Sequence, residues 1–500
     1  MDNSDFLEKK SPIEHPLELL KQIQSDLDDI EATHFGKRIT LENKYQKKFQ
    51  PFYTKRYEIV NSSLKLMLKS SYIPPQEIGV PNFWLIAMKS NEAVAELIQK
   101  HDEDALRYLK DIKWCRIQVT DDMYPDPKAT EGFKLEFVFD SNPYFRNSVL
   151  SKTYCMYDED NDIIEKVIGT PIEWFPGKCL TNKVLSMSKS SIGMTRTILD
   201  SFFNFFNPIE VTEDADAERV ESLMQPDYSA ALSLRDVIIP HAVYWFTEGN
   251  SDNESGAKIG DITNSQKNAK VEKLSHTILQ NVKLLEQIQS KHDLLEDMFF
   301  DARRHFLAKY LKRCQPLFRK RYEIVNGIKP GDQAELKAGK EKRVPNFWLT
   351  ALKANKTVGK MIQLEDEEIL KYLKDIRWDL VTRGFKLEFD FNQNTYFRNA
   401  LLTVSYFVID EFFPAPSLEE TIGTEIEWLV KRRLTTADSF FNIFTRPTSL
   451  DCKDSEKAEE WRSRMELDYA IGLKIWKDVI PHAVSLFTTT GEFEDRIGGG

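Results

Sequence analysis

The stretch VPNFWLIAMKSN, from Val80 to Asn91, returns almost unchanged as VPNFWLTALKAN, from Val344 to Asn355. Further blocks repeat around it in the same order: KRYEIVN, LRYLKDIKW, GFKLEFVFD, SFFNFF and DVIIPHAVYWF return as KRYEIVN, LKYLKDIRW, GFKLEFDFN, SFFNIF and DVIPHAVSLF. A shared order of this extent indicates duplication of a whole domain. We expect one domain in residues 1–248, a second in 271–490 and a short tail in 491–500.

The segment between the two copies, residues 249–270, reads GNSDNESGAKIGDITNSQKNAK. It is rich in glycine, serine and asparagine and poor in large apolar residues. This composition is typical of a flexible linker.

Each copy opens with apolar residues at helical spacing, which predicts long helices near 17–60 and 271–326. A helix of this length needs a partner along its apolar stripe. Packing on its own domain is one possibility, but so long a stripe would outrun a domain of this size and favours a seam between two helices. The predicted seam residues are Leu20, Ile23, Leu27 and Ile30 in the first copy, and Val282, Leu285, Ile288 and Leu295 in the second.

The remainder of each copy is predicted to be α+β. A helical segment runs from the VPNFW block to Ile112, and strict alternation from Phe133 to Phe139 predicts a half-buried strand. Further strands are expected around 148–157 and at Ile172–Trp174. The closing third, from SFFNFF to Phe246, is predicted to be helical again.

Composition and motifs exclude several classes of protein. The net charge of −11 disfavours DNA as the direct partner. The five scattered cysteines form no CxxC pair, and neither an apolar span nor a signal peptide is present, so we predict no metal, no cofactor and no membrane. No Walker, GxGxxG, HExxH or GxSxG motif is found, and we predict that the chain is not an enzyme. His241 and His482 are predicted to be structural, and Arg56 is expected on a helix surface.

The repeated blocks resemble the nucleosome assembly protein family, especially its plant members. KRYEIVN, VPNFWL, GFKLEF, IGTPIEW, SFFNFFNP and IPHAV carry the resemblance, which covers about 17–247 and 271–488. It implies two tandem domains, each a long dimerisation helix followed by an α/β "earmuff" domain with a small antiparallel sheet. The fused copies would form an intramolecular pseudo-dimer, or a higher homo-oligomer if the helices pair between chains.

The resemblance also implies an ATP-independent histone chaperone of nucleus and cytoplasm. Its partners would be core histones, with the dimer type preferred and the tetramer type possible, and little or no direct contact with nucleic acid. Acidic surface would carry the binding. The candidate residues are Asp102, Glu103, Asp104, Asp158, Glu159, Asp160, Glu210, Glu213, Asp214, Asp216, Glu218, Glu365, Asp366, Glu367 and Glu368. For any single cluster, a solvated face is the plainer explanation.

Two alternatives remain open at this point. The chain ends TTTGEFEDRIGGG, without the long acidic tail usual in the family, which motivates an interaction scaffold or phosphatase-regulator-like protein that has lost histone handover. A fusion of two neighbouring genes in the gene assignment is the other, and transcripts crossing Gly249–Lys270 would test it.

Overall fold

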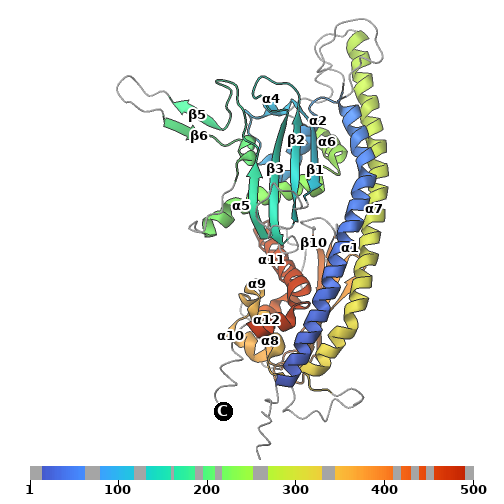
Figure 1. The fold of residues 1–500 in the computed structure, drawn as a ribbon, viewed down its shortest axis with the longest axis vertical. Helices are drawn as coiled ribbons and strands as arrows, with labels where there is room; N and C mark the ends of the chain where they lie inside the picture. The colour runs from blue at the N-terminus through green and yellow to red at the C-terminus, as the bar shows by residue number, and fades with distance from the viewer. Residues whose placement is uncertain are drawn as a thin grey trace, which may run out of the picture. The chain divides into compact units, whose positions relative to one another are not determined.

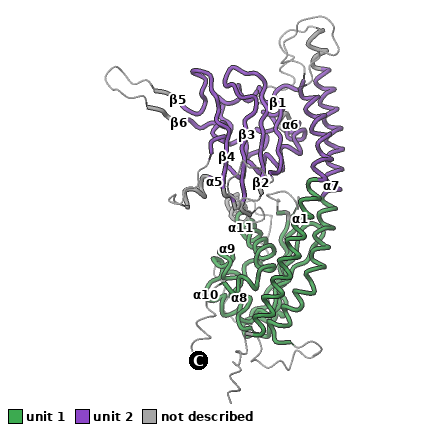
Figure 2. Tube along the Cα trace, viewed as in Figure 1, with its two compact units in different colours: residues 1–43, 300–500 green, residues 44–299 purple. Residues whose placement is uncertain are grey.

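The computed structural model describes residues 14–61, 79–117, 131–158, 163–185, 195–208, 217–251, 269–328, 344–408, 418–429, 439–445 and 455–489. The chain divides into two compact units, which Figure 2 shows in separate colours. Unit 1 comprises residues 1–43 and 300–500, and unit 2 comprises residues 44–299.

Two long helices, α1 (Glu14–Val60) and α7 (Ala269–Val325), open the two sequence copies. Both boundaries lie within three residues of the predicted ones. The division between units falls inside both helices, so each unit contains one part of α1 and one part of α7, which we call helix halves (Figure 2). The compact units therefore differ from the sequence copies: each unit unites one copy's globular part with helix halves from both copies.

Within each unit the two helix halves run antiparallel. In unit 2, Tyr45 contacts Phe299 and Tyr53 contacts His292, so positions on α7 fall as those on α1 rise. In unit 1, His34 stacks on Phe306 while residues nearer the start of α1 pack on Cys314. Figure 1 shows α1 and α7 side by side. This agrees with the predicted helix-to-helix seam.

The globular part of unit 2 begins with short helices and continues into an antiparallel sheet of strand order β1-β2-β3-β4. A separate two-stranded ribbon and a closing helical segment follow (Figure 1). The elements are α2 (Phe83–Lys89), α3 (Glu92–Ala95), α4 (Glu103–Leu106), β1 (Leu109–Arg116), β2 (Glu131–Phe139), β3 (Val149–Asp158), β4 (Ile163–Gly169), β5 (Asn182–Leu185), β6 (Thr195–Ile198), the 3-10 helix η3 (Phe202–Phe206), α5 (Ala217–Leu232), the π-helix η4 (Ser233–Ile238) and α6 (Ala242–Ser251).

The globular part of unit 1 repeats this order of short helices, sheet and closing helices, with the sheet β10-β9-β8-β7 and no ribbon among its described residues. Its elements are α8 (Phe347–Ala354), α9 (Lys356–Gly359), α10 (Leu364–Leu370), β7 (Leu373–Val381), β8 (Gly384–Phe391), β9 (Leu401–Val408), β10 (Leu418–Gly423), the 3-10 helix η7 (Phe440–Phe444), α11 (Ser455–Lys474), the π-helix η8 (Ile475–Val479) and α12 (Ala483–Thr489). The predicted α+β architecture is confirmed in both copies.

Each core lies between one sheet face, the SFFNFF block and the helices of the same unit. In β2, Phe133, Leu135 and Phe137 are all buried, as their alternation predicts. Phe137 meets Phe206 edge to face, and the aromatic side chains of η3 fill the space beside β3 and β4. These aromatic residues therefore belong to the core.

Two local predictions are wrong. The helical segment was expected to continue to Ile112, but Leu109–Arg116 forms strand β1, paired with β2. Ile172–Trp174 is not a strand, since only Trp174 forms an isolated bridge, to Phe145. At Leu109–Arg116, pairing with β2 decides the conformation, which local periodicity does not encode.

None of the described helices has an apolar stretch long enough to cross a lipid bilayer.

Candidate functional site

Two of the predicted surface acids are buried. Asp102 and Asp366 are 0% and 2% exposed. The Asp102 carboxylate accepts hydrogen bonds from the Ser201 hydroxyl at 2.6 Å and from the Phe202 backbone amide at 2.7 Å. Asp366 accepts the equivalent bonds from Ser439 and Phe440. Their prediction as histone-binding residues is wrong, because each carboxylate is used to anchor the SFFNFF block.

The acids beside these two carry lysine partners. Lys89 and Lys100 contact Glu103 at 2.7 and 3.0 Å, and Lys353 contacts Glu367 at 2.6 Å. Burial raises the pKa of Glu103, but the hydrogen bonds from both lysines bring that pKa below its usual value. Much of the negative charge at these two positions is thus balanced locally.

Three predicted acids in these clusters face solvent. Asp104 has a 70% exposed side chain 3.6 Å from Arg107, and Glu368 has a 58% exposed side chain 2.5 Å from Lys371. Glu365 is exposed at the start of α10. These side chains remain candidates for contact with a basic partner.

The other predicted acids fall where little is described. Asp158 ends β3 and Glu218 lies in α5, but the structure describes only their backbone. Outside the described residues lie Glu159, Asp160, Glu210, Glu213, Asp214 and Asp216. The acidic connector after SFFNFF therefore stays a sequence-based prediction.

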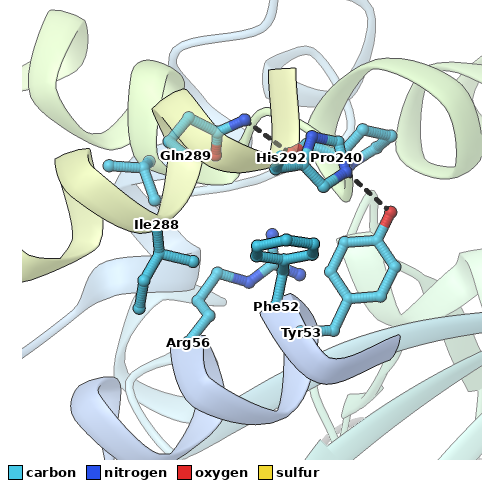
Figure 3. A pocket seen from close by; sticks show the side chains of 8 residues that line it. Phe52, Tyr53, Arg56, Pro240, Ile288, Gln289 and His292 are labelled. Carbon is cyan, nitrogen blue, oxygen red and sulfur yellow. Dashed lines mark hydrogen bonds between the residues drawn. The ribbon is translucent and has the colours of Figure 1, made fainter. Parts of the chain in front are cut away.

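The predicted seam residues pack either between the helix halves or against a globular core. In unit 1, Ile23 and Leu27 are buried against Cys314, with Ile30 partly buried beside them, and Leu20 joins the core of the second copy's globular part. In unit 2, Leu285 and Val282 join the core of the first copy, and Ile288 lies with Phe52 and Tyr53 (Figure 3). Leu295 is partly buried. The seam thus merges with each globular core.

The position of Arg56 in α1 contradicts its prediction. It was expected on the surface but is 4% exposed, and its Nη1 donates to the Ile239 carbonyl at 2.5 Å, with the guanidinium 4.9 Å from the Trp84 ring centroid. Arg321 makes the same contacts with Ile480 and Trp348. The identical KRYEIVN blocks were the available signal. Each arginine fixes the turn that precedes the copy's last helix.

A side chain from the other copy completes the same turn. Gln289 of α7 donates to the Pro240 carbonyl at 3.0 Å, and Gln24 of α1 donates to the Pro481 carbonyl at 3.0 Å. Figure 3 shows Gln289, Pro240 and Arg56 around one small cavity, together with Tyr53 and His292. We call each of these turns, with its arginine and glutamine, a helix junction. In each junction, the arginine of one long helix and the glutamine of the other donate hydrogen bonds to the same turn.

The two copies differ inside the sheet. In the first, Lys152 is buried and contacts Asp227, whose other oxygen accepts a hydrogen bond from the Tyr154 hydroxyl at 2.6 Å. In the second, Val404 and Asp468 stand at the equivalent positions of lysine and aspartate. Burial raises the pKa of Asp468 to about 6. Sequence patterns had not singled out either arrangement.

The family model described as "Nucleosome assembly protein (NAP)" matches residues 15–249, 280–437 and 429–490. Together these ranges cover most of both copies. This chain belongs to the nucleosome assembly protein family. Because the family model matches each half of the chain, the repeat is a tandem pair of family domains.

Curated nucleosome assembly proteins from plants are similar to half of this chain. "Nucleosome assembly protein 1;2" of Oryza sativa subsp. indica is 48% identical over 279 residues, covering 52% of this chain and 74% of that protein. The Arabidopsis thaliana protein of the same name is 46% identical over 266 residues, covering 49% and 68%. Each relative thus corresponds to about one of the two copies.

A solved structure, "Nucleosome Assembly Protein 1 from Plasmodium knowlesi", is 31% identical, covers 49% of this chain and 99% of that chain, and has a TM-score of 0.37. Because the TM-score is below 0.5, this likeness adds nothing to the assignment. The nucleosome assembly protein fold follows from the family match and the α+β units described above.

Proposed function

We infer that this chain is a histone chaperone, which binds core histones and assists nucleosome assembly and disassembly. The observation that carries this inference is the family match across both copies. Each copy also retains the order of short helices, four-stranded sheet and closing helices. The chain's net charge of −11 suits a basic partner.

Binding would be electrostatic and distributed over several exposed acids. Asp104, Glu365 and Glu368 are exposed on equivalent helices of the two copies, whereas buried Asp102 and Asp366 hold those helices in place. Single exposed pairs contribute only about 0–1 kcal/mol, so several must act together. We propose the dimer-type histone pair as the preferred partner and the tetramer type as a possible one.

The handover of histones to DNA would follow from the same electrostatic binding. Histones would be held by equilibrium competition with DNA, without nucleotide hydrolysis or other catalysis and with little direct contact with nucleic acid. We propose that the chain acts in both nucleus and cytoplasm. Within one polypeptide, the paired helix halves would replace the dimer interface that separate subunits otherwise form.

Salt-resolved titration of the full chain with each histone complex tests this function, with solution mass measured alongside. Binding should weaken as salt rises, because screening reduces the attraction. The double variant Asp104→Lys and Glu365→Lys should weaken binding, while Lys113→Ala, which changes an exposed cation, should not.

A chaperone should also keep histone–DNA mixtures from precipitating. A folded single-chain particle that neither binds histones at physiological salt nor prevents precipitation would contradict the inference. That result would favour the scaffold alternative, for which the lysine partners of Glu103 and Glu367 are the relevant observation.

A further inference from the structure

A cluster of potential metal ligands lies at the helix junction of unit 2. His241, in the turn between η4 and α6, has its Nε2 atom 3.4 Å from Glu296 Oε2 and its Nδ1 atom 3.8 Å from Asp293 Oδ1. Asp293 and Glu296 lie one helical turn apart on α7, so their side chains share a face. One potential ligand atom from each of the three residues lies within 4.8 Å of the others.

A second imidazole is directed at the same carboxylate. His292 is 2% exposed, and its Nδ1 atom lies 3.6 Å from Asp293 Oδ1 without a hydrogen-bond partner among the described residues. Its other ring nitrogen, Nε2, faces the Tyr53 hydroxyl at 3.3 Å, as Figure 3 shows. A buried polar atom without a partner is unfavourable, and a cation at this point would satisfy it.

A tetrahedral metal ion would draw these side chains closer together. Zinc bonds to histidine nitrogen and carboxylate oxygen of about 2.0–2.1 Å place neighbouring ligands about 3.3 Å apart. His241, Asp293 and Glu296 each offer one atom within 4.8 Å of the others, and His292 Nδ1 lies 3.6 Å from Asp293. Only one of the two His241 nitrogens can bind a given ion, so His241 and His292 would have to rotate toward it. We propose that His241, His292, Asp293 and Glu296 bind one divalent transition-metal ion of the zinc class.

The charges around the cluster are compatible with a cation. Burial and the neighbouring His292 lower the pKa of His241 to about 4. The positive charge of Arg56 acts on His241, and Asp111 interacts with that guanidinium. The two carboxylates would neutralise a divalent ion.

The equivalent junction of unit 1 supplies a matched comparison. There His482 lies 3.6 Å from Glu31 and 4.0 Å from Asp28, so three of the four ligand types recur. Leu27 occupies the position of His292 in the repeat, and the ligand side chains are more exposed than those in unit 2. We expect unit 1 to bind the ion more weakly.

The ion would join the two sequence copies within unit 2. His241 belongs to the first copy's closing turn, whereas the other three ligands lie on the second copy's long helix. Four protein ligands would leave no open coordination position, which is typical of structural rather than catalytic zinc. The site would strengthen the helix junction and is independent of histone binding.

Titration of the metal-free, untagged full chain with Co²⁺ tests the proposal, because tetrahedral Co²⁺ with nitrogen and oxygen ligands absorbs visible light more strongly than the octahedral aquo ion. We expect one tight equivalent with tetrahedral absorption, displaced by Zn²⁺, and a higher melting temperature with Zn²⁺. His292→Leu should weaken binding at least about tenfold. Leu27→His should add a second tight equivalent in unit 1.

Controls separate loss of a ligand from loss of fold. Leucine is already tolerated at the equivalent position in unit 1, and circular dichroism would confirm that His292→Leu folds. His276→Ala, which removes an exposed imidazole from α7, should leave the tight equivalent unchanged. Octahedral spectra only, or equal affinity in folded His292→Leu and in the unaltered chain, would overturn the proposal.

Discussion

The Nζ atom of Lys152 lies 2.5 Å from the Oδ1 atom of Asp227 inside the first copy. The lysine side chain is 1% exposed and that of the aspartate 14% exposed, so the pair is largely removed from water. The second copy keeps the aspartate, as Asp468, but has Val404 in place of the lysine. The carboxylate therefore has a buried lysine partner in the first copy. In the second copy its charge interacts with that of Arg464 instead.

Replacing Lys152 by valine should destabilise unit 2 by about 3–5 kcal/mol, because Asp227 would keep a buried charge without its cation. The measurement is urea-induced unfolding at pH 7. Adding Asp227→Asn to this variant should restore part of the loss. An unchanged unfolding midpoint in Lys152→Val would show that the pair contributes nothing.

Asp468→Asn should stabilise unit 1 at pH 7 by about 1–2 kcal/mol, after allowance for partial solvent exposure. Burial raises the pKa of Asp468 from 3.8 to about 6, with Arg464 opposing the rise. Between about pH 4 and pH 6 the folded state therefore binds more protons than the unfolded state, and stability falls as pH rises.

Chemical denaturation of the unaltered chain and Asp468→Asn at pH 4 and pH 7 measures this effect. The variant's advantage should shrink at pH 4, where the unaltered carboxyl group is largely protonated when folded. An equal advantage at both pH values would mean that ionisation of Asp468 is not the cause.

Asp102→Asn should destabilise unit 2 by about 1–3 kcal/mol, since the amide cannot accept from both the Ser201 hydroxyl and the Phe202 amide. Thermal unfolding tests this. Asp104→Asn is the matched control, because Asp104 lies two residues further along the chain and is exposed. This variant should change stability by less than about 0.5 kcal/mol. Similar losses in both variants would contradict the anchoring role.

Thiol labelling should report on the seam of unit 1. Burial raises the pKa of Cys314 to about 11, and the residue is 0% exposed, whereas Cys115 is exposed. Iodoacetamide followed by peptide mass spectrometry should therefore modify Cys115 well before Cys314. Ile23→Asp, which places a charge beside Cys314, should speed its labelling; equal rates in the unaltered chain would argue against a closed seam.

Sequence patterns predicted the parts of the fold that local periodicity determines. The apolar stripe located α1 and α7, and the alternation from Phe133 to Phe139 located β2, because each pattern requires one buried face. Strand β1 was missed because its pairing with β2 overrides the helical tendency of the preceding segment. The length of the apolar stripe favoured a seam between two helices, and the family resemblance implied that these are dimerisation helices.

Side-chain roles were harder to predict than elements. Asp102 and Glu103 are adjacent acids in the sequence, but one anchors a buried turn and the other pairs with surface lysines. Arg56 and its neighbour Lys55 look alike in composition, and only Arg56 points into the core. These differences arise from tertiary contacts between distant segments, which charge and spacing do not specify.

The division of both long helices between the units has a consequence for biosynthesis. Residues 14–43 leave the ribosome before their partners in unit 1, which begin at residue 300. Unit 2 can assemble once residue 299 has emerged, while the opening half of α1 still exposes Leu20, Ile23 and Leu27 to solvent. Since nascent domains fold as units during synthesis, this opening part of α1 is buried only after unit 2 has formed, and during that interval it is a natural target for chaperones that recognise apolar helices.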